Sequence, residues 1–110
     1  MEQVLLVITN LGDIAGARQL GRALVERRLA ACVNIMPAVE SVYRWRGAVE
    51  EAGEVTLVIK TTAGRYAELE EAVRALHPYE LPELIAVPVT AGLPAYLHWV
   101  AQETRKETDV

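Results

Sequence analysis

One stretch, residues 29–62, constrains the fold of this chain more than any other. From residue 29 to residue 45 small and apolar side chains alternate, which is the period of a β-strand. The chain turns at Arg46-Gly47, passes a polar patch and returns through residues 54–62, so a long β-hairpin is predicted. Pro37 donates no backbone hydrogen bond, and therefore the first arm belongs at a sheet edge or contains a bulge. This arm, at about 15 residues, far exceeds the usual strand of roughly 5–6, and such an edge invites another chain.

Two amphipathic helices are predicted, one on each side of the hairpin. Residues 14–28 place apolar side chains at helical spacing, and Asp13 precedes them as a candidate N-cap. Residues 63–77 carry a second apolar stripe, with Thr62 as a candidate cap. This helix must end near His77, because the proline that follows disfavours a helical conformation in the residue before it.

Two short apolar runs complete the predicted sheet. Residues 4–9 are rich in β-branched side chains and read as a strand covered on both faces. Residues 84–89 read as a fourth strand, and Pro88 again assigns it to an edge. Pro94 suits the first turn of a last helix, and the polar tail 102–110 is expected to fray.

The order β-α-β-β-α-β followed by a helix predicts an α+β fold of the ferredoxin-like class. Right-handed crossovers give the strand order 4-1-3-2, which places both proline-containing strands at edges. The length of 110 residues suits a single domain, residues 1–110, with one core.

Composition narrows the class of protein. Hydrophobic residues make up 52% of the chain and charged residues 24%, which indicates a globular protein. The net charge of −4 argues against a nucleic-acid partner or an anionic membrane surface. No apolar run has the length of a membrane span or of a signal peptide's hydrophobic region, so a soluble cytoplasmic protein is expected.

Three side chains are candidates for metal binding, and none has a second ligand at typical spacing. Cys32 is the only cysteine, so no internal disulfide forms; its neighbours favour a small core residue over a reactive or metal-binding thiol. His77 lies at a helix end, where it can bind a metal, interact with the helix dipole or face solvent. His98 lies beside Trp99 and is expected to pack or hydrogen-bond there.

The most unusual loop is 77–83, because two prolines stiffen it. Tyr79 and Glu83 would present polar groups on this rigid frame, although an ordered helix-to-strand connection explains the same residues. Lys60 stands in an otherwise apolar strand. It either extends to the end of the sheet or lies in a cleft, where it pairs with an anion or a carboxylate such as Glu83.

Tyr43 and Trp45 end the first arm of the hairpin between arginines. Aromatic and arginine side chains at a projecting tip suit an interface anchor. The alternative is that Trp45 folds back on its own hairpin.

Several motifs of catalysis are absent. The chain has no GxxxxGK[ST], GxGxxG, CxxC or HExxH motif and no evident nucleophile–base pair, so it is not expected to be an enzyme. Residues 55–59 lack the stacking aromatic side chains of RNA-recognition domains on this fold.

Five segments resemble the CutA divalent-cation tolerance proteins, and they occur in the order of that family across nearly the whole chain. They are RLAACVNI at 28–35, SVYRWRG at 41–47, KTT at 60–62, HPYELPE at 77–83 and YLHW at 96–99. The resemblance implies a ferredoxin-like subunit of a stable, cytoplasmic homotrimer that joins through edge strands, as in the PII signalling proteins. It also implies a link to tolerance of copper and other divalent cations, without an enzymatic reaction.

The copper ligands proposed for the family carry over only in part. They are a cysteine at the end of the first strand and two successive histidines before Pro-Tyr. In this chain Ile8 and Leu76 stand at two of these positions, and only His77 remains.

Two functions are therefore predicted. The first is a trimeric protein that binds Cu(II) or another divalent metal ion through His77, with Cys32 or carboxylates such as Glu83. The alternative is a PII-like signalling or adaptor trimer, which binds a small anionic ligand or a partner protein in an intersubunit cleft. The candidate residues for that cleft are Lys60, Tyr79, Glu83 and Trp45.

Overall fold

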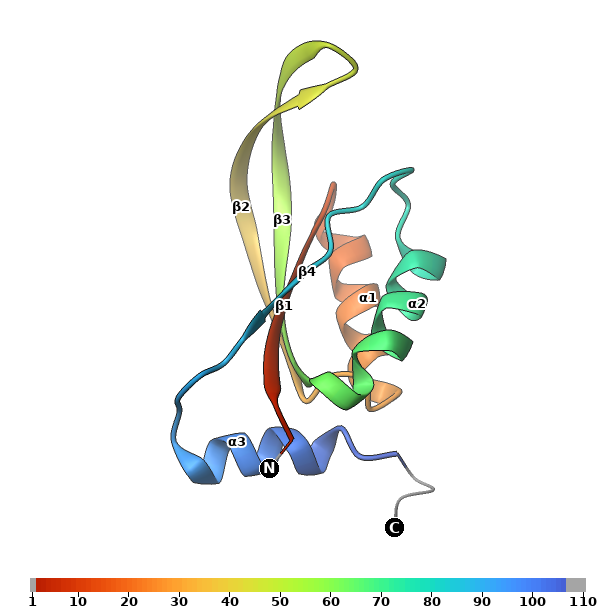
Figure 1. The fold of residues 1–110 in the computed structure, drawn as a ribbon. Helices are drawn as coiled ribbons and strands as arrows, with labels where there is room; N and C mark the ends of the chain where they lie inside the picture. Colours follow the sequence, from red (N-terminus) through yellow and green to blue (C-terminus); the bar gives the residue numbers. More distant parts are fainter. Residues whose placement is uncertain (1, 107–110) are drawn as a thin grey trace.

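The computed structural model describes residues 2–106, which form a four-stranded antiparallel sheet with three helices (Figure 1). The strands are β1 (Val4–Leu11), β2 (Cys32–Trp45), β3 (Ala48–Thr62) and β4 (Ile85–Pro88). The helices are α1 (Ile14–Glu26), α2 (Tyr66–Leu76) and α3 (Pro94–Glu103), and a 3-10 turn, η1 (Ala63–Arg65), leads into α2. The strand order β2-β3-β1-β4 confirms the predicted α+β architecture and leaves β2 and β4 at the edges.

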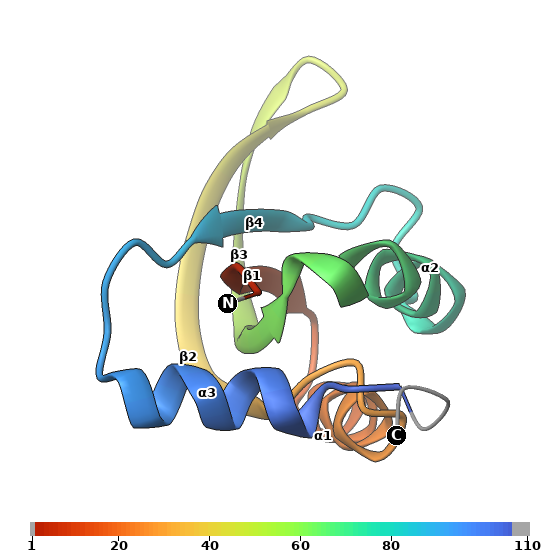
Figure 2. The same ribbon diagram turned by 60° about the horizontal axis from the view of Figure 1, so that its bottom comes forward.

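Helices α1 and α2 lie side by side against one face of the sheet (Figures 1 and 2). The core forms between these layers, where Val7, Leu57 and Ile59 of the sheet are fully buried together with Leu24 and Leu69 of the helices. Burying a side chain of this size contributes roughly 1.5–3 kcal/mol, so this face provides the main stabilisation of the subunit.

The opposite face of the sheet is not covered by α1 and α2, and we call it the open face. Strand registers align its side chains in rows, with Cys32, Lys60, Leu6 and Val87 in one row and Asn34, Val58, Ile8 and Ile85 in the next. Met36, Thr56 and Asn10 form a third row. Helix α3 lies by the end of the sheet where β1 begins (Figure 1) and leaves Ile85 and Val87 51% and 45% exposed.

The predicted hairpin is confirmed, but each of its two strands begins at a different residue from the one predicted. Its turn is Arg46-Gly47, where both residues have positive φ, as a two-residue hairpin loop of primed type requires. The register shifts between Met36 and Val39, which confirms a bulge at Pro37. The polar patch before residue 54 is not a connection, because β3 begins at Ala48 and pairs along its length.

The first arm begins later than the alternation predicts. Arg28 adopts φ 58°, and the amides of Leu29 and Ala30 both donate to the carbonyl of Leu24, at 2.9 and 3.2 Å. Residues 29 and 30 therefore close the end of α1 instead of continuing β2, and both are buried.

Helix ends follow the predictions in part. Asp13 Oδ1 accepts from the amide of Gly16 at 2.9 Å and caps α1, whereas the Thr62 side chain makes no capping hydrogen bond. The predicted fraying from residue 102 differs from the structure, since α3 runs through Glu103 and Thr104 is buried, with its hydroxyl donating to Val100 O at 2.8 Å. Residues 107–110 lie outside the described residues.

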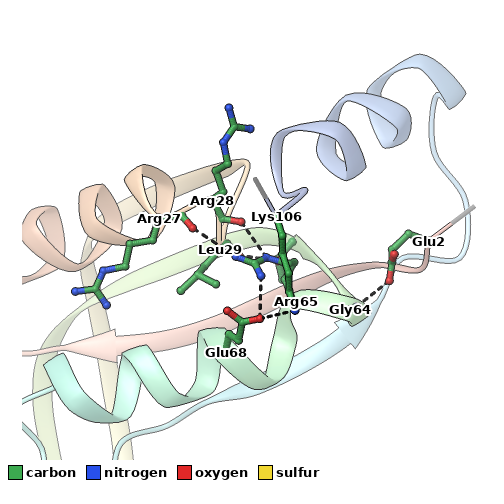
Figure 3. A network of polar contacts seen from close by, with 9 residues as sticks. Glu2, Arg27, Arg28, Leu29, Gly64, Arg65, Glu68 and Lys106 are labelled. Atoms are coloured by element: carbon green, nitrogen blue, oxygen red, sulfur yellow. Dashed lines mark hydrogen bonds and ion pairs between the residues drawn. The ribbon is translucent and has the colours of Figure 1, made fainter. Parts of the chain in front are cut away.

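A polar network joins α1, α2 and the end of α3 (Figure 3). The Arg65 side chain is only 9% exposed, and its guanidinium donates to the carbonyls of Arg28 and Arg27 at 3.3 and 3.4 Å. It also pairs with Glu68 at 2.9 Å, and Lys106 reaches the same carboxylate oxygen at 3.0 Å. Arg65 thereby satisfies the carbonyls of Arg27 and Arg28, which directly follow α1.

Candidate functional site

The loop 77–83 is fixed to the sheet through Asn10 in β1. His77 Nε2 lies 2.7 Å from the Asn10 carbonyl, and the Asn10 amide donates to Glu83 Oε1 at 2.8 Å. Thr56 Oγ1 donates to Asn10 Oδ1 at 2.5 Å. One asparagine therefore connects the two ends of the loop to the two central strands.

Both ring nitrogens of His77 are engaged within the chain. His77 is only 7% exposed, and its Nδ1 accepts from the amide of Tyr79 at 3.2 Å. Because Nδ1 accepts, the proton belongs on Nε2, which donates to Asn10. His77 therefore does not face solvent, and it offers a nitrogen to a metal ion only if one of these hydrogen bonds breaks.

Tyr79 points from the loop to the start of α1 and to β3. Its hydroxyl donates to Glu54 Oε2 at 3.2 Å, and a side chain on Gly12 would approach that hydroxyl to 3.2 Å. Burial, and next the negative charge of Glu54, raise the pKa of Tyr79, which keeps the hydroxyl protonated as a donor.

The hairpin turn is tied to the same loop. Arg46 pairs with Glu80 at 2.9 Å, and its guanidinium lies 5.3 Å from the centre of the Trp45 ring. Trp45 thus contacts the adjacent residue of its own turn, yet it stays 37% exposed, and Tyr43 stays 43% exposed, so their role as interface anchors stays a prediction.

A groove of about 410 Å³ lies between the start of α1, the bulge in β2 and the facing part of β3. Asp13, Glu40 and Glu54 line it, together with Pro37 and Gly53. Sequence reasoning missed this groove, although the bulge predicted at Pro37 forms part of its lining. Its carboxylates suit a cationic group better than an anion.

The structure does not bring the predicted metal ligands together. Cys32 aligns with Lys60 and Leu6, whereas His77 contacts Asn10, which lies four residues further along β1, or roughly 13 Å. Among residues 2–106 no three His, Cys, Asp or Glu side chains gather as a metal site needs.

The predicted cleft residues also separate. Lys60 Nζ donates to Asn34 Oδ1 and lies 3.8 Å from Cys32 Sγ, while Glu83 is bound by Asn10. Within one chain Lys60 therefore does not pair with Glu83, and the intersubunit cleft predicted for Lys60, Tyr79 and Glu83 stays a prediction.

Known proteins resemble this chain in sequence and in fold. The family described as CutA1 divalent ion tolerance protein matches residues 5–103. The chain belongs to the CutA1 family. This confirms the resemblance found in the sequence, and the matched range includes the loop 77–83 and the long hairpin.

CutA relatives align closely with this chain. The divalent-cation tolerance protein CutA of Thermus thermophilus is 46% identical over 104 residues, which cover 94% of this chain and 99% of that one. The mouse protein CutA is 52% identical over 88 residues, or 80% of this chain, but the match spans only 50% of its own length. The solved CutA1 structure from T. thermophilus superposes with a TM-score of 0.91 at 44% identity and covers 93% and 99% of the two chains.

The names of CutA relatives give different cellular locations. One solved relative is named a periplasmic protein and one sequence relative a chloroplastic one, so a cytoplasmic location stays a prediction for this chain. Among residues 2–106 no helix combines the length and the apolar character needed to cross a bilayer.

Proposed function

We propose that this chain acts in divalent-cation tolerance as a homotrimer that assembles through the open face and the edge strands of its sheet. The tolerance function follows the names of its relatives, which state a tolerance and no reaction. The number of three subunits, the PII-like mode of assembly and the cytoplasmic location follow the family resemblance in the sequence.

The proposal of an assembly rests mainly on one observation, the apolar character of the open face. Ile85 and Val87 of edge strand β4 are 51% and 45% exposed there and lie in adjacent rows, and Met36 on the opposite edge strand, β2, is 46% exposed. Contiguous exposed apolar side chains on a folded domain mark an interaction surface, and fully burying each would contribute about 1.5–3 kcal/mol.

The edge strand β2 supports the same proposal. It has 14 residues and only β3 as a neighbour within the chain, so its outer edge offers backbone groups to another strand. A second copy of this chain presents both the apolar face and a free edge, and it is therefore the occupant that we propose.

Trp45→Ala is expected to weaken this assembly more than it changes the subunit. Trp45 stays 37% exposed at the hairpin tip, where an aromatic ring can anchor a neighbouring copy. Far-UV circular dichroism should stay unchanged, while the denaturant midpoint of trimer dissociation falls. An unchanged midpoint would exclude Trp45 as an anchor.

The metal-binding part of the proposal concerns Cu(II) or another divalent ion, with His77 and Cys32 as the ligands predicted from the sequence. The contacts of His77 support a structural role instead, because both of its nitrogens already have partners. We therefore propose that direct metal binding by the trimer depends on ligands other than His77.

Calorimetric titration of the assembled protein with Cu(II) and Zn(II) tests this. His77→Gln keeps a donor and an acceptor at the site, and we expect it to bind either ion with the affinity and stoichiometry of the original chain. Loss of a site with one ion per subunit or one per trimer in His77→Gln would restore His77 as a ligand. A chain that binds neither ion more tightly than about 1 mM would contradict direct metal binding and favour the adaptor function.

A further inference from the structure

The outer part of the hairpin, residues 40–53, has no core of its own. None of its side chains is buried, and Val42 and Val49 are 67% and 64% exposed. It projects beyond α1 and α2, and its turn curves towards the side on which the loop 77–83 lies (Figures 1 and 2). Because an isolated two-stranded hairpin is at best marginally stable in water, the order of this part depends on contacts with other segments.

The loop 77–83 makes such contacts at two points of the hairpin. The Tyr79 hydroxyl donates to Glu54 Oε2 at 3.2 Å, directly beside the base of the outer part. The next residue, Glu80, pairs with Arg46 in the turn at 2.9 Å. Two neighbouring residues of one loop therefore bind the outer hairpin at its two ends.

The loop itself is held by the sheet and not by the hairpin tip. His77 Nε2 donates to the Asn10 carbonyl at 2.7 Å, and the Asn10 amide donates to Glu83 Oε1 at 2.8 Å. The Asn10 side chain is fixed in turn by Thr56, whose hydroxyl donates to its oxygen at 2.5 Å. Both ends of the loop are thus attached to the central strands, while its middle reaches the hairpin.

We propose that the loop 77–83 is a conformational strap, which holds the outer hairpin at a fixed angle to the sheet and thereby positions the ring of Trp45 at its end. Arg46, which the strap binds through Glu80, lies 5.3 Å from the centre of that ring. The strap acts within one chain. Only its effect on assembly rests on the proposed trimer.

Hydrogen exchange of the full chain, followed residue by residue by nuclear magnetic resonance, tests the strap. Tyr79→Phe removes the hydroxyl but keeps the ring, which contacts His77 edge-on at 4.8 Å. We expect the hydrogen-bonded amides of residues 40–53 to exchange about tenfold faster or more, while those of α1 and β1 keep their rates.

Tyr96→Phe is the matched control for this variant. It removes the same group from α3, which lies by the other end of the sheet (Figure 1), so exchange in the hairpin should stay unchanged. Equal exchange of residues 40–53 in Tyr79→Phe and in the original chain would overturn the proposal.

A charge swap tests the second contact of the strap. Arg46→Glu should speed exchange in the turn, and adding Glu80→Arg to the same chain should slow it again. The pair is 70% and 75% exposed, so salt screens it. In Tyr79→Phe, where this pair is the remaining contact of the strap, added salt should therefore speed exchange in the turn further. No recovery in the swapped chain would overturn a strap that binds at two points.

Sedimentation of the same samples separates the strap from the assembly. Tyr79→Phe should dissociate at about threefold higher concentration or more, because a less ordered hairpin loses more freedom on binding a neighbour. If the original chain sediments as a single chain throughout, the proposed trimer fails, and the exchange comparison still tests the strap. If protection of residues 40–53 instead falls with the oligomeric mass on dilution and is equal in Tyr79→Phe, the assembly orders the hairpin and the strap is wrong.

Discussion

Val87→Lys is expected to dissociate the proposed trimer into folded single chains. Val87 lies on edge strand β4 in the open-face row that contains Leu6 and Lys60, and it is 45% exposed in the isolated chain. A lysine there would place a second ammonium on an apolar face that the assembly buries, at a cost of several kcal/mol. The midpoint concentration of dissociation should rise about 100-fold or more, measured by sedimentation velocity across a dilution series.

Leu76→Lys is the matched control for this variant. Leu76 is also 45% exposed, but it ends α2 on the other side of the molecule, so its change should leave the oligomeric mass as it is. Far-UV circular dichroism checks that both variants keep their helices and strands. If Val87→Lys sediments like the original chain, or if both variants dissociate alike, the open face is not the assembly surface.

Arg65→Ala is expected to lower the free energy of unfolding by about 2–4 kcal/mol. The change removes an almost buried guanidinium and leaves the carbonyls of Arg27 and Arg28 without donors at the end of α1. It also removes one of the two cations on Glu68. Urea denaturation followed by circular dichroism measures the loss.

Arg22→Ala provides the comparison. Arg22 pairs with Glu26 one helical turn away at 3.4 Å, but its side chain is 80% exposed, so the expected change is within about 0.5 kcal/mol. Arg65→Lys should fall between the two, because lysine keeps the charge but cannot reach all three oxygens with a rigid fork. Equal effects of Arg65→Ala and Arg22→Ala would show that the buried network adds nothing to stability.

The fold was largely predictable because its signals are local. Pro37 and Pro88 mark edge strands through their missing amide hydrogens, and Asp13 marks a helix start through its side chain. The start of β2 was not predictable in this way. Leu29 is as apolar as a strand residue, and only the positive φ of Arg28 shows that the chain is still closing α1 there.

The candidate site was less predictable because its contacts join residues far apart in the sequence. The rigid loop 77–83 stands out by its prolines, but its partner Asn10 follows the run from which β1 was predicted. The contact between Lys60 and Asn34 depends on the register of β2 against β3, and the bulge at Pro37 alters that register further along the strand. Alternation alone does not fix such a register across a bulge.

Sedimentation equilibrium of the unmodified chain at low micromolar concentration tests the central claim most directly. The proposed assembly predicts a single species with three times the chain mass of 12.1 kDa, which persists on dilution. A species of one chain mass at that concentration would contradict it, and the apolar open face would then need a different partner.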